Sequence, residues 1–262
     1  MEEKSSIIKV LFIGDVVGKG ARQYLRKILP ELSKQYLPDL IITNAENSAD
    51  GRGMTSAIYD EYMKMGIGCL TSGNHIFDNK DIIGNIEHCF YLLRPHNYPK
   101  ISPGKGYQLL EIHGQEIAII SLQGQVFMPS CNNPFEAMDK LLEELKAIKV
   151  IIVDFHAEAT SEKIAMAYYL QGKVSAVIGT HTHVQTADER IFADHTAYIS
   201  DVGMVGSANS ILGMHKDNVL QKFTTNISKR LEPDLTDIVL DAVIMEIDQE
   251  TGRAVSINRV RG

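Results

Sequence analysis

The sequence predicts a mixed α/β protein, a layered sandwich of sheets flanked by helices, and two observations carry this prediction. Short runs rich in Val and Ile recur along the chain, and their length and composition are typical of buried strands. These runs cover residues 7–13, 40–42, 69–70, 150–153 and 174–178. Helical patterns lie between several of the runs, and this alternation indicates βαβ units and a largely parallel sheet.

Three segments have the periodicity of helices. Residues 21–32 repeat apolar side chains at the spacing of one helix face. Pro30 lies inside this segment and is expected to kink the helix or to end its first part. Asn133 followed by Pro134 is typical of a helix start, because Asn caps the first turn and Pro favours the first helical position. A third helix is expected over residues 164–170.

Two regions depart from the alternation of strand and helix. Residues 107–112 and 116–122 flank a polar turn and predict a hairpin, as do residues 242–247 and 254–260. The sequence contains no internal repeat, low-complexity segment or linker. We therefore expect a single domain over residues 1–262.

Composition and charge narrow the class of protein. The chain has 262 residues, of which 44% are hydrophobic and 23% charged, enough to bury a sizeable core. The formal net charge of −7 argues against a broad nucleic-acid surface, although it leaves a local nucleotide pocket open. The first six residues show no secretory pattern, and no apolar run approaches the roughly 18 residues of a membrane helix. Three cysteines without a CxxC motif predict free thiols. We expect a cytoplasmic protein without a membrane partner.

Polar residues follow all five predicted strands, at the point where each strand ends. They are Asp15 after the first run, Glu46 and Asn47 after the second, Asn74 and His75 after the third, His156 after the fourth, and His181 and His183 after the fifth. Any one of them alone is more typical of a helix cap or a turn. Five such groups are hard to explain as caps, because ligands of open α/β sheets bind outside the carboxyl ends of the strands.

The side-chain types at these strand ends fit metal binding. Carboxylate, amide and imidazole donors form a mixed, fairly hard set that suits Mn, Fe, Zn or Mg. His181 and His183 would share a face on an extended strand, whereas on a loop they could reach different ions. The sequence therefore predicts a metal site where the strand ends converge.

Two motifs then resemble a known superfamily. Gly73-Asn74-His75 resembles the Gly-Asn-His signature of calcineurin-like metallophosphoesterases, and residues 179–183 resemble their Gly-x-His-x-His element with one residue inserted after the glycine. The usual opening Asp-x-His is here Asp15-Val16-Val17, and a glutamate in Asn44-Ala45-Glu46-Asn47 replaces the bridging aspartate. Both departures match the YmdB-like bacterial branch, a family with 2′,3′-cyclic-nucleotide 2′-phosphodiesterase activity, and this resemblance spans essentially the whole chain.

The resemblance implies a metallophosphoesterase-type fold, a layered sandwich of mixed sheets flanked by helices. It also implies two metal ions per chain, with iron as the first choice and manganese or magnesium as alternatives. Asp15, Glu46, Asn47 and His183 would hold the first ion, and Glu46, Asn74, His156 and His181 the second, with Glu46 bridging them. It further implies that a hydroxide between the ions attacks a 2′,3′-cyclic nucleotide to give the 3′-nucleotide. His75 corresponds to the family's proton donor, which protonates the leaving ribose oxygen.

Alternatives remain at this stage. A phosphomonoesterase or nucleotidase would use the same site, and a regulatory protein could keep the fold without turnover. Arg52 is a candidate contact for a substrate phosphate, although Asp50-Gly51 beside it is also typical of a plain turn. Asp201 is a candidate for orienting a ligand histidine. The expected partner is a small nucleotide or phosphodiester substrate, and homo-oligomers stay open.

Overall fold

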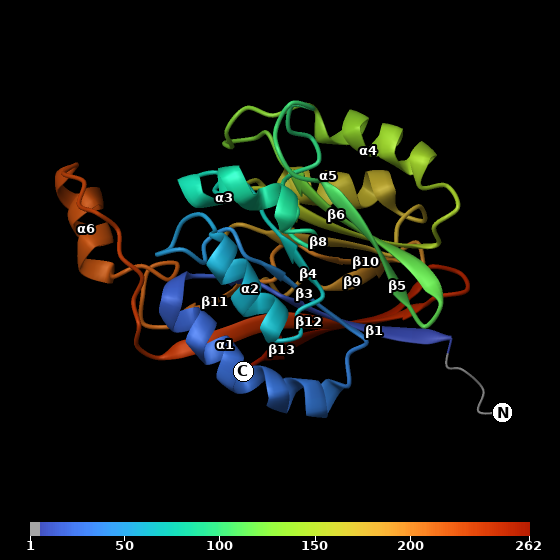
Figure 1. Cartoon of the computed structure of the whole chain (residues 1–262), viewed down its shortest axis with the longest axis horizontal. Helices are drawn as coiled ribbons and strands as arrows, with labels where there is room; N and C mark the ends of the chain where they lie inside the picture. The colour runs from blue at the N-terminus through green and yellow to red at the C-terminus, as the bar shows by residue number, and fades with distance from the viewer. Residues whose placement is uncertain (1–5) are drawn as a thin grey trace.

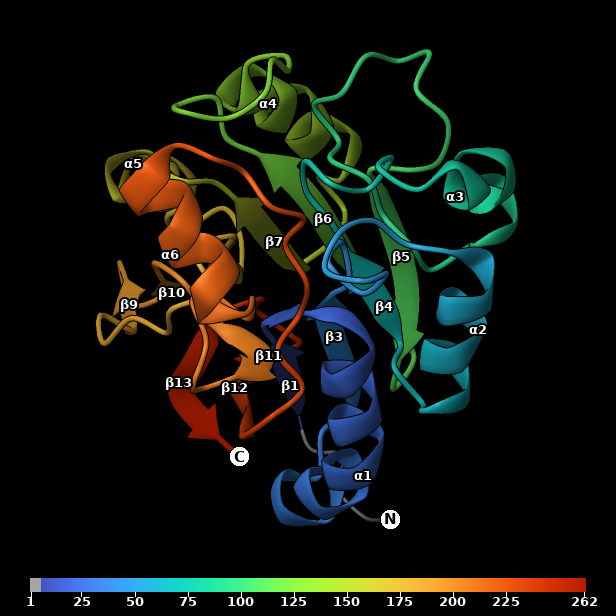
Figure 2. The same ribbon diagram turned by 90° about the vertical axis from the view of Figure 1, so that its left-hand side faces the viewer.

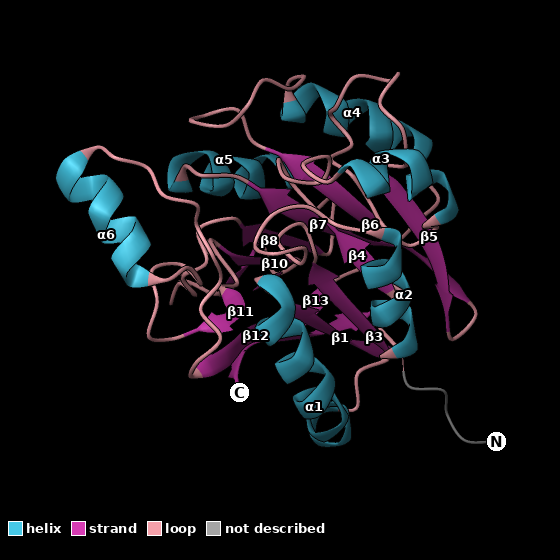
Figure 3. Ribbon diagram, turned by 60° about the vertical axis from the view of Figure 1, so that its left-hand side comes forward, coloured by secondary structure: helices cyan, strands magenta, loops and turns pink. Residues whose placement is uncertain are grey.

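Two β-sheets pack face to face in the computed structural model, with helices on both outer faces (Figures 1 and 3). The structure describes residues 6–262, so the first five residues of the predicted domain, and most of the segment that lacks a secretory pattern, lie outside it. No helix among the described residues is both long enough and apolar enough to cross a membrane.

The first sheet contains strands from both ends of the chain. Its strands are β1 (Ile7–Ile13), β2 (Asp15–Val16), β3 (Leu40–Asn44), β4 (Cys69–Thr71), β11 (Met204–Ser207), β12 (Ile238–Asp248) and β13 (Ala254–Arg261). They follow the order β2-β11-β12-β1-β3-β4, and β13 pairs with β12. β1, β3 and β4 are parallel, whereas β12 runs antiparallel to β1.

The second sheet is built from the middle of the chain. Its strands are β5 (Tyr107–Ile112), β6 (Gln115–Gln123), β7 (Val150–His156), β8 (Ala176–Thr180), β9 (Arg190–Phe192) and β10 (Thr196–Ile199). They follow the order β5-β6-β7-β8-β10-β9. The four central strands are parallel, and β5 and β9 are antiparallel edge strands.

Most of the helices cover the outer faces of the two sheets. They are α1 (Gly18–Tyr36), α2 (Ser56–Lys64), α3 (Lys80–Asn85), a 3-10 turn at Ile86–His88, α4 (Pro134–Glu144), α5 (Thr160–Leu170) and α6 (Lys216–Thr225). α1 and α2 pack on the first sheet, and α4 and α5 pack on the second. α6 projects away from both sheets (Figures 1 and 3).

Alternating side chains of each strand enter different layers of the core. Along β1, Ile8, Val10 and Phe12 face the second sheet, whereas Leu11 and Ile13 face the helices. β6 and β7 divide their side chains in the same way between the two sheets and the outer helices. Because both faces of these strands are buried, their sequences are continuous apolar runs without a polar alternation.

The structure confirms the five predicted strands, both hairpins and the helix start at Asn133, whose Oδ1 accepts hydrogen bonds from the next turn. Of the two outcomes expected at Pro30, an end of the helix is not observed, because α1 continues to Tyr36 with Pro30 on its exposed side. The strand–helix alternation accounts for the parallel strands, and the hairpins add antiparallel strands, so both sheets are mixed. The three cysteines are free thiols, as predicted.

The end of β8 depends on a glycine that leaves room for a neighbouring backbone. A Cβ at Gly179 would lie 1.8 Å from the carbonyl oxygen of Ser200, so the two segments must separate to accept one. We expect Gly179→Ala to lower the free energy of unfolding by about 1–3 kcal/mol or more, as overpacked core substitutions do. Thermal unfolding of the variant measures this loss.

Gly84→Ala in α3 is the matched control. A Cβ at Gly84 meets no other atom of the described residues within 4 Å, so this variant should keep or slightly raise the unfolding temperature. Equal unfolding temperatures for the two variants would contradict the packing argument.

Candidate metal centre

The predicted site residues come from both sheets and lie where their strands end. The end of the molecule that carries them faces the viewer in Figure 2. Asp15 lies on β2, Glu46 and Asn47 follow β3, Asn74 follows β4, His156 ends β7, and His181 and His183 follow β8. The packing of one sheet on the other therefore brings together residues that are far apart in the sequence.

Four of these residues form one cluster around the ring of His156. Its Nε2 atom lies 2.9 Å from Glu46 Oε1, 3.2 Å from Asn74 Oδ1 and 3.0 Å from His181 Nδ1. The ligand atoms of Glu46, His156 and His181 lie within 4.8 Å of one another, close enough to share a metal ion. This cluster contains the four residues expected at the second ion.

A second cluster joins Asp15, Asn47 and His183. Asn47 Nδ2 lies 3.3 Å from Asp15 Oδ1 and 3.1 Å from His183 Nε2, and that Nε2 lies 3.6 Å from Asp15 Oδ1. The two clusters are adjacent, because Asp15 Oδ2 accepts a hydrogen bond from the backbone N–H of His181. Glu46 is expected at both ions, but its carboxylate contacts the cluster around His156. Its position as a bridge between the two ions therefore stays a prediction.

The ring of His156 is oriented by a relay that the motifs did not reveal. Thr180 Oγ1 donates to Asp154 Oδ1 at 2.7 Å and accepts from His156 Nδ1 at 2.8 Å, which leaves Nε2 for the cluster. A Cβ at Gly73 would lie 1.9 Å from His156 Cδ2, so the ring packs directly on the glycine backbone. This contact gives a physical reason for glycine before Asn74.

His181 and His183 occupy a loop and belong to different clusters. Both have positive φ angles, 101° and 63°, so they do not share the face of an extended strand. His183 Nδ1 donates to the carbonyl of Leu212, and His181 Nε2 lies 3.2 Å from Glu158 Oε2. His183 therefore presents its Nε2 atom to the cluster with Asn47, and His181 presents its Nδ1 atom to the cluster around His156.

Asp201 holds the peptide between these two histidines. Its Oδ2 accepts hydrogen bonds at 2.8 Å from the backbone N–H of Thr182 and from Lys163 Nζ. Asp201 and Lys163 are both buried. Within the described residues the hydrogen bonds of the Asp201 carboxylate therefore go to Lys163 and to the loop backbone, so Asp201 positions the loop that carries the two histidines. The sequence analysis did not identify Lys163. A charged residue on the buried face of α5 is unusual and is the signal that could have revealed it.

Buried charge dominates the electrostatics of the site. Burial alone would raise the pKa of Asp15, but the hydrogen bond and charge of His183 lower it to about 2. Burial would lower the pKa of His156, but the Glu46 carboxylate raises it to about 9. Burial and the neighbouring His156 lower the pKa of His181 to about 3. The buried carboxylates of Asp15 and Glu46 therefore favour positive charge beside them. In this structure the rings of His183 and His156 supply it, and metal ions would supply it equally well.

The donor atoms fit a metal centre. Glu46 Oε1 is buried and, apart from the neighbouring His156 ring, has no hydrogen-bond partner within residues 6–262, as a ligand atom would be left without its ion. Asn74 directs its oxygen at His156 Nε2, whereas Asn47 directs its nitrogen into the second cluster, so ligation by Asn47 requires its amide to turn. Carboxylate, amide and imidazole donors suit manganese, iron or zinc.

His75 lies at the edge of the first cluster. Its backbone N–H donates to Glu46 Oε2 at 2.9 Å, its Nδ1 lies 2.7 Å from Asp78 Oδ2, and its Nε2 lies 3.2 Å from Asn74 Nδ2. The contact with Asn74 fits a role in positioning a ligand. The sequence analysis did not single out Asp78. Its contact with Nδ1 holds the His75 ring in place, which fits a role for His75 as a proton donor.

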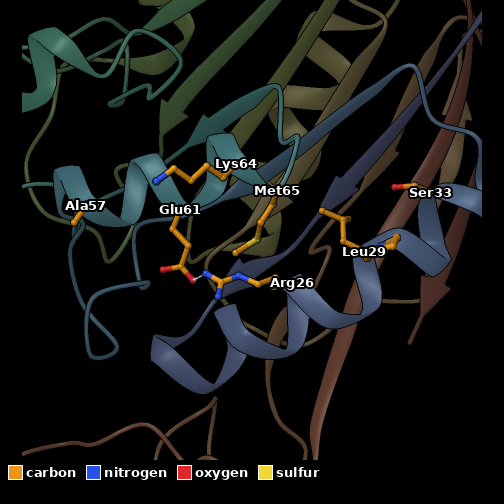
Figure 4. Close-up of a pocket in the computed structure, with 8 residues that line it drawn as sticks. Arg26, Leu29, Ser33, Ala57, Glu61, Lys64 and Met65 are labelled. Carbon is orange, nitrogen blue, oxygen red and sulfur yellow. Dashed lines mark hydrogen bonds and ion pairs between the residues drawn. The ribbon is translucent and has the colours of Figure 1, made fainter.

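Arg52 lies outside both clusters. Its side chain is exposed and lines a separate cavity beside the turn that carries Asn47. A further cavity of about 670 Å³ lies between α1 and α2, where Arg26 and Glu61 form an ion pair beside Leu29 and Met65 (Figure 4). None of the described residues that line this further cavity is a predicted site residue.

Comparisons with known proteins find similar chains over almost the whole length of this one. The 2′,3′-cyclic-nucleotide 2′-phosphodiesterase of Bacillus subtilis (strain 168) is 44% identical over 254 residues, which cover 97% of this chain and 96% of that protein. The crystal structure of a novel phosphatase from Mycoplasma pneumoniae has a TM-score of 0.93 at 33% identity and covers 98% of this chain and 93% of its own. A hypothetical protein from Thermus thermophilus has a TM-score of 0.91 at 37% identity, covering 97% and 99%.

A more distant structure shares the fold alone. The 5′-nucleotidase precursor from Thermus thermophilus has a TM-score of 0.58 at 12% identity, with 97% of this chain and 54% of that chain covered. The predicted layered sandwich of mixed sheets is therefore confirmed. The sequence profile of the family described as YmdB-like protein matches residues 11–260. This match over nearly the whole chain shows that the protein belongs to the YmdB-like family.

Proposed function

We propose that the chain is a metal-dependent phosphodiesterase that hydrolyses 2′,3′-cyclic nucleotides to 3′-nucleotides. The observation that supports this most is the convergence of two adjacent clusters of carboxylate, amide and imidazole groups at the strand ends. The identity of 44% to an enzyme of that name supports the same substrate class.

The two clusters would hold two metal ions, iron first, with manganese or magnesium as alternatives. Such ions supply a nucleophile at neutral pH and stabilise negative charge on the phosphoryl oxygens. The chain's own contribution is orientation. Thr180 and the Leu212 carbonyl fix the rings of His156 and His183, so that in each ring one nitrogen faces the cluster. Glu46 is proposed to bridge the two positions.

His75 is proposed to donate the proton. The bond between phosphorus and the ribose 2′-oxygen breaks as a water oxygen joins the phosphorus, and the departing alkoxide leaves poorly unless it is protonated. In this proposal His75 Nε2 gives that proton, while Asp78 accepts a hydrogen bond from Nδ1 and holds the ring. Arg52 would help to hold a substrate phosphate.

We also propose that the chain acts as one domain, because residues from both sheets share the central layer of the core. Location in the cytoplasm and assembly into homo-oligomers stay predictions.

Metal content tests the proposed centre. Protein purified without chelators should hold about two transition-metal ions per chain, and Glu46→Ala should lower occupancy of both positions if Glu46 bridges them. Elemental analysis measures both, with Glu111→Ala, an exposed strand residue outside the site, as control. Fewer than one ion per chain after addition of iron or manganese would refute the metal centre.

The products test the substrate class. Chromatography should show 3′-nucleotides from 2′,3′-cyclic nucleotides, with similar rates for different bases, since no base-reading motif is visible in the sequence. Turnover of phosphomonoesters alone would favour the nucleotidase alternative. A metal-loaded protein without turnover on either class would favour the regulatory one.

Two substrates separate the roles open to His75. His75→Ala or His75→Gln should lower kcat on a cyclic nucleotide by roughly 10²–10⁴-fold, typical of a lost general acid. A nitrophenyl phosphodiester has an acidic leaving group and should lose much less, while metal content stays near that of the unmodified protein. Equal losses on both substrates, or loss of metal, would show that His75 only positions Asn74.

A further inference from the structure

A cavity that holds none of the predicted metal ligands lies beside the turn after β3, and four of the nine described residues that line it are basic. It has a volume of about 490 Å³, which is in the range of small-molecule sites. Arg52 lines it from the turn after β3, and Lys222, Lys229 and Arg230 line it from α6 and the segment that follows. We call this feature the basic cavity.

The positive charge of the basic cavity is uncompensated. All four basic side chains are exposed, and within the part of the chain that the structure describes none of them forms an ion pair or a side-chain hydrogen bond. Asp50 is the one acidic group among the described residues that line it. Four unpaired cations in one concave site of a chain with net charge −7 favour an anionic ligand. Guanidinium and ammonium groups are the side chains that bind phosphate.

Two segments connect the basic cavity to the metal centre. Arg52 follows Asn47 within the same turn, and Met214 on the cavity wall follows Leu212, whose carbonyl orients His183. The two segments touch, because a Cβ at Gly51 would lie 2.6 Å from Met214 Cε. The basic cavity and the candidate metal centre are therefore built in part from the same two chain segments.

We propose that the basic cavity binds the phosphodiester next to the reacting nucleotide, so that the preferred substrate is a short RNA strand whose 3′ end carries a 2′,3′-cyclic phosphate. The inference rests on the proposed function, which places the cyclic phosphate at the metal centre. A second phosphate one nucleotide away is then the anion that an RNA strand offers and a cyclic mononucleotide lacks. The negative charge of the chain as a whole limits the contact to a short strand.

The reaction at the strand end is the same hydrolysis. The bond between phosphorus and the terminal 2′-oxygen breaks, water supplies the new oxygen on phosphorus, and the 2′-oxygen takes the proton. The strand keeps a 3′-phosphate and its internal phosphodiesters stay intact. Such ends are supplied by RNA cleavage in which a 2′-hydroxyl attacks its neighbouring phosphate.

Steady-state kinetics on two substrates tests the proposal. The metal-loaded protein should show a kcat/KM at least about tenfold higher for an adenosine dinucleotide ending in a 2′,3′-cyclic phosphate than for adenosine 2′,3′-cyclic phosphate, because one further phosphate is bound. This preference should weaken as the salt concentration rises. The double variant Lys229→Gln/Arg230→Gln should bring the ratio of the two kcat/KM values close to one.

The double variant Lys140→Gln/Lys146→Gln is the matched control. It removes the same charge from exposed positions on α4 and the turn after it, outside the basic cavity, and should keep the preference for the dinucleotide. Equal kcat/KM for the two substrates in the unmodified protein, or equal loss of preference in both double variants, would overturn the inference while leaving the proposed function intact. Failure to hydrolyse either substrate would overturn the proposed function itself.

Discussion

The burial of three carboxylates beneath the strand ends is the constraint on which the rest of the site depends. Asp15, Glu46 and Asp154 have no exposed surface, and a buried carboxylate is strongly destabilising unless hydrogen bonds or positive charge compensate it. Each is compensated by groups from another strand end: Asp15 by His183, Glu46 by His156, and Asp154 by a threonine hydroxyl. The two sheets must therefore meet in one register, because a shift of either would leave a carboxylate without its partner.

The polar residues at the strand ends were predictable from the sequence because the signal for each one lies in its neighbouring residues. Each apolar run stops at a polar residue, and parallel strands bring such residues to one edge without knowledge of the packing between sheets. The partners that orient the rings were less accessible. Leu212 acts through its backbone carbonyl, which carries no sequence signal, and Lys163 reaches Asp201 only because α5 packs over the end of β8. Local rules allowed either a kink or an end of the helix at Pro30, and α1 continues to Tyr36 because its apolar face packs on the first sheet on both sides of this residue.

The net charge of the chain indicates how the surface as a whole attracts or repels ions, but it does not show where charges of one sign gather. An excess of acidic residues describes the average field around the molecule, whereas recognition depends on the field inside a concavity. Some basic side chains elsewhere in the described chain pair with carboxylates, as Arg26 does with Glu61, but those around the basic cavity do not. The net charge, which is a sum over the sequence, cannot show where the basic side chains gather. Their positions depend on how α6 and the segment after it lie against the turn that follows β3.

The short segment from Leu212 to Met214 belongs to two sites at once. Its first residue orients His183, and its last residue forms part of the basic cavity wall. Free energies of binding obey reciprocity, so a strand whose affinity for the cavity depends on an ion at His183 must change the affinity of that ion by the same factor. Metal loading and substrate capture are in that case not separate properties of the molecule, and an affinity for either ligand has meaning only at a stated concentration of the other.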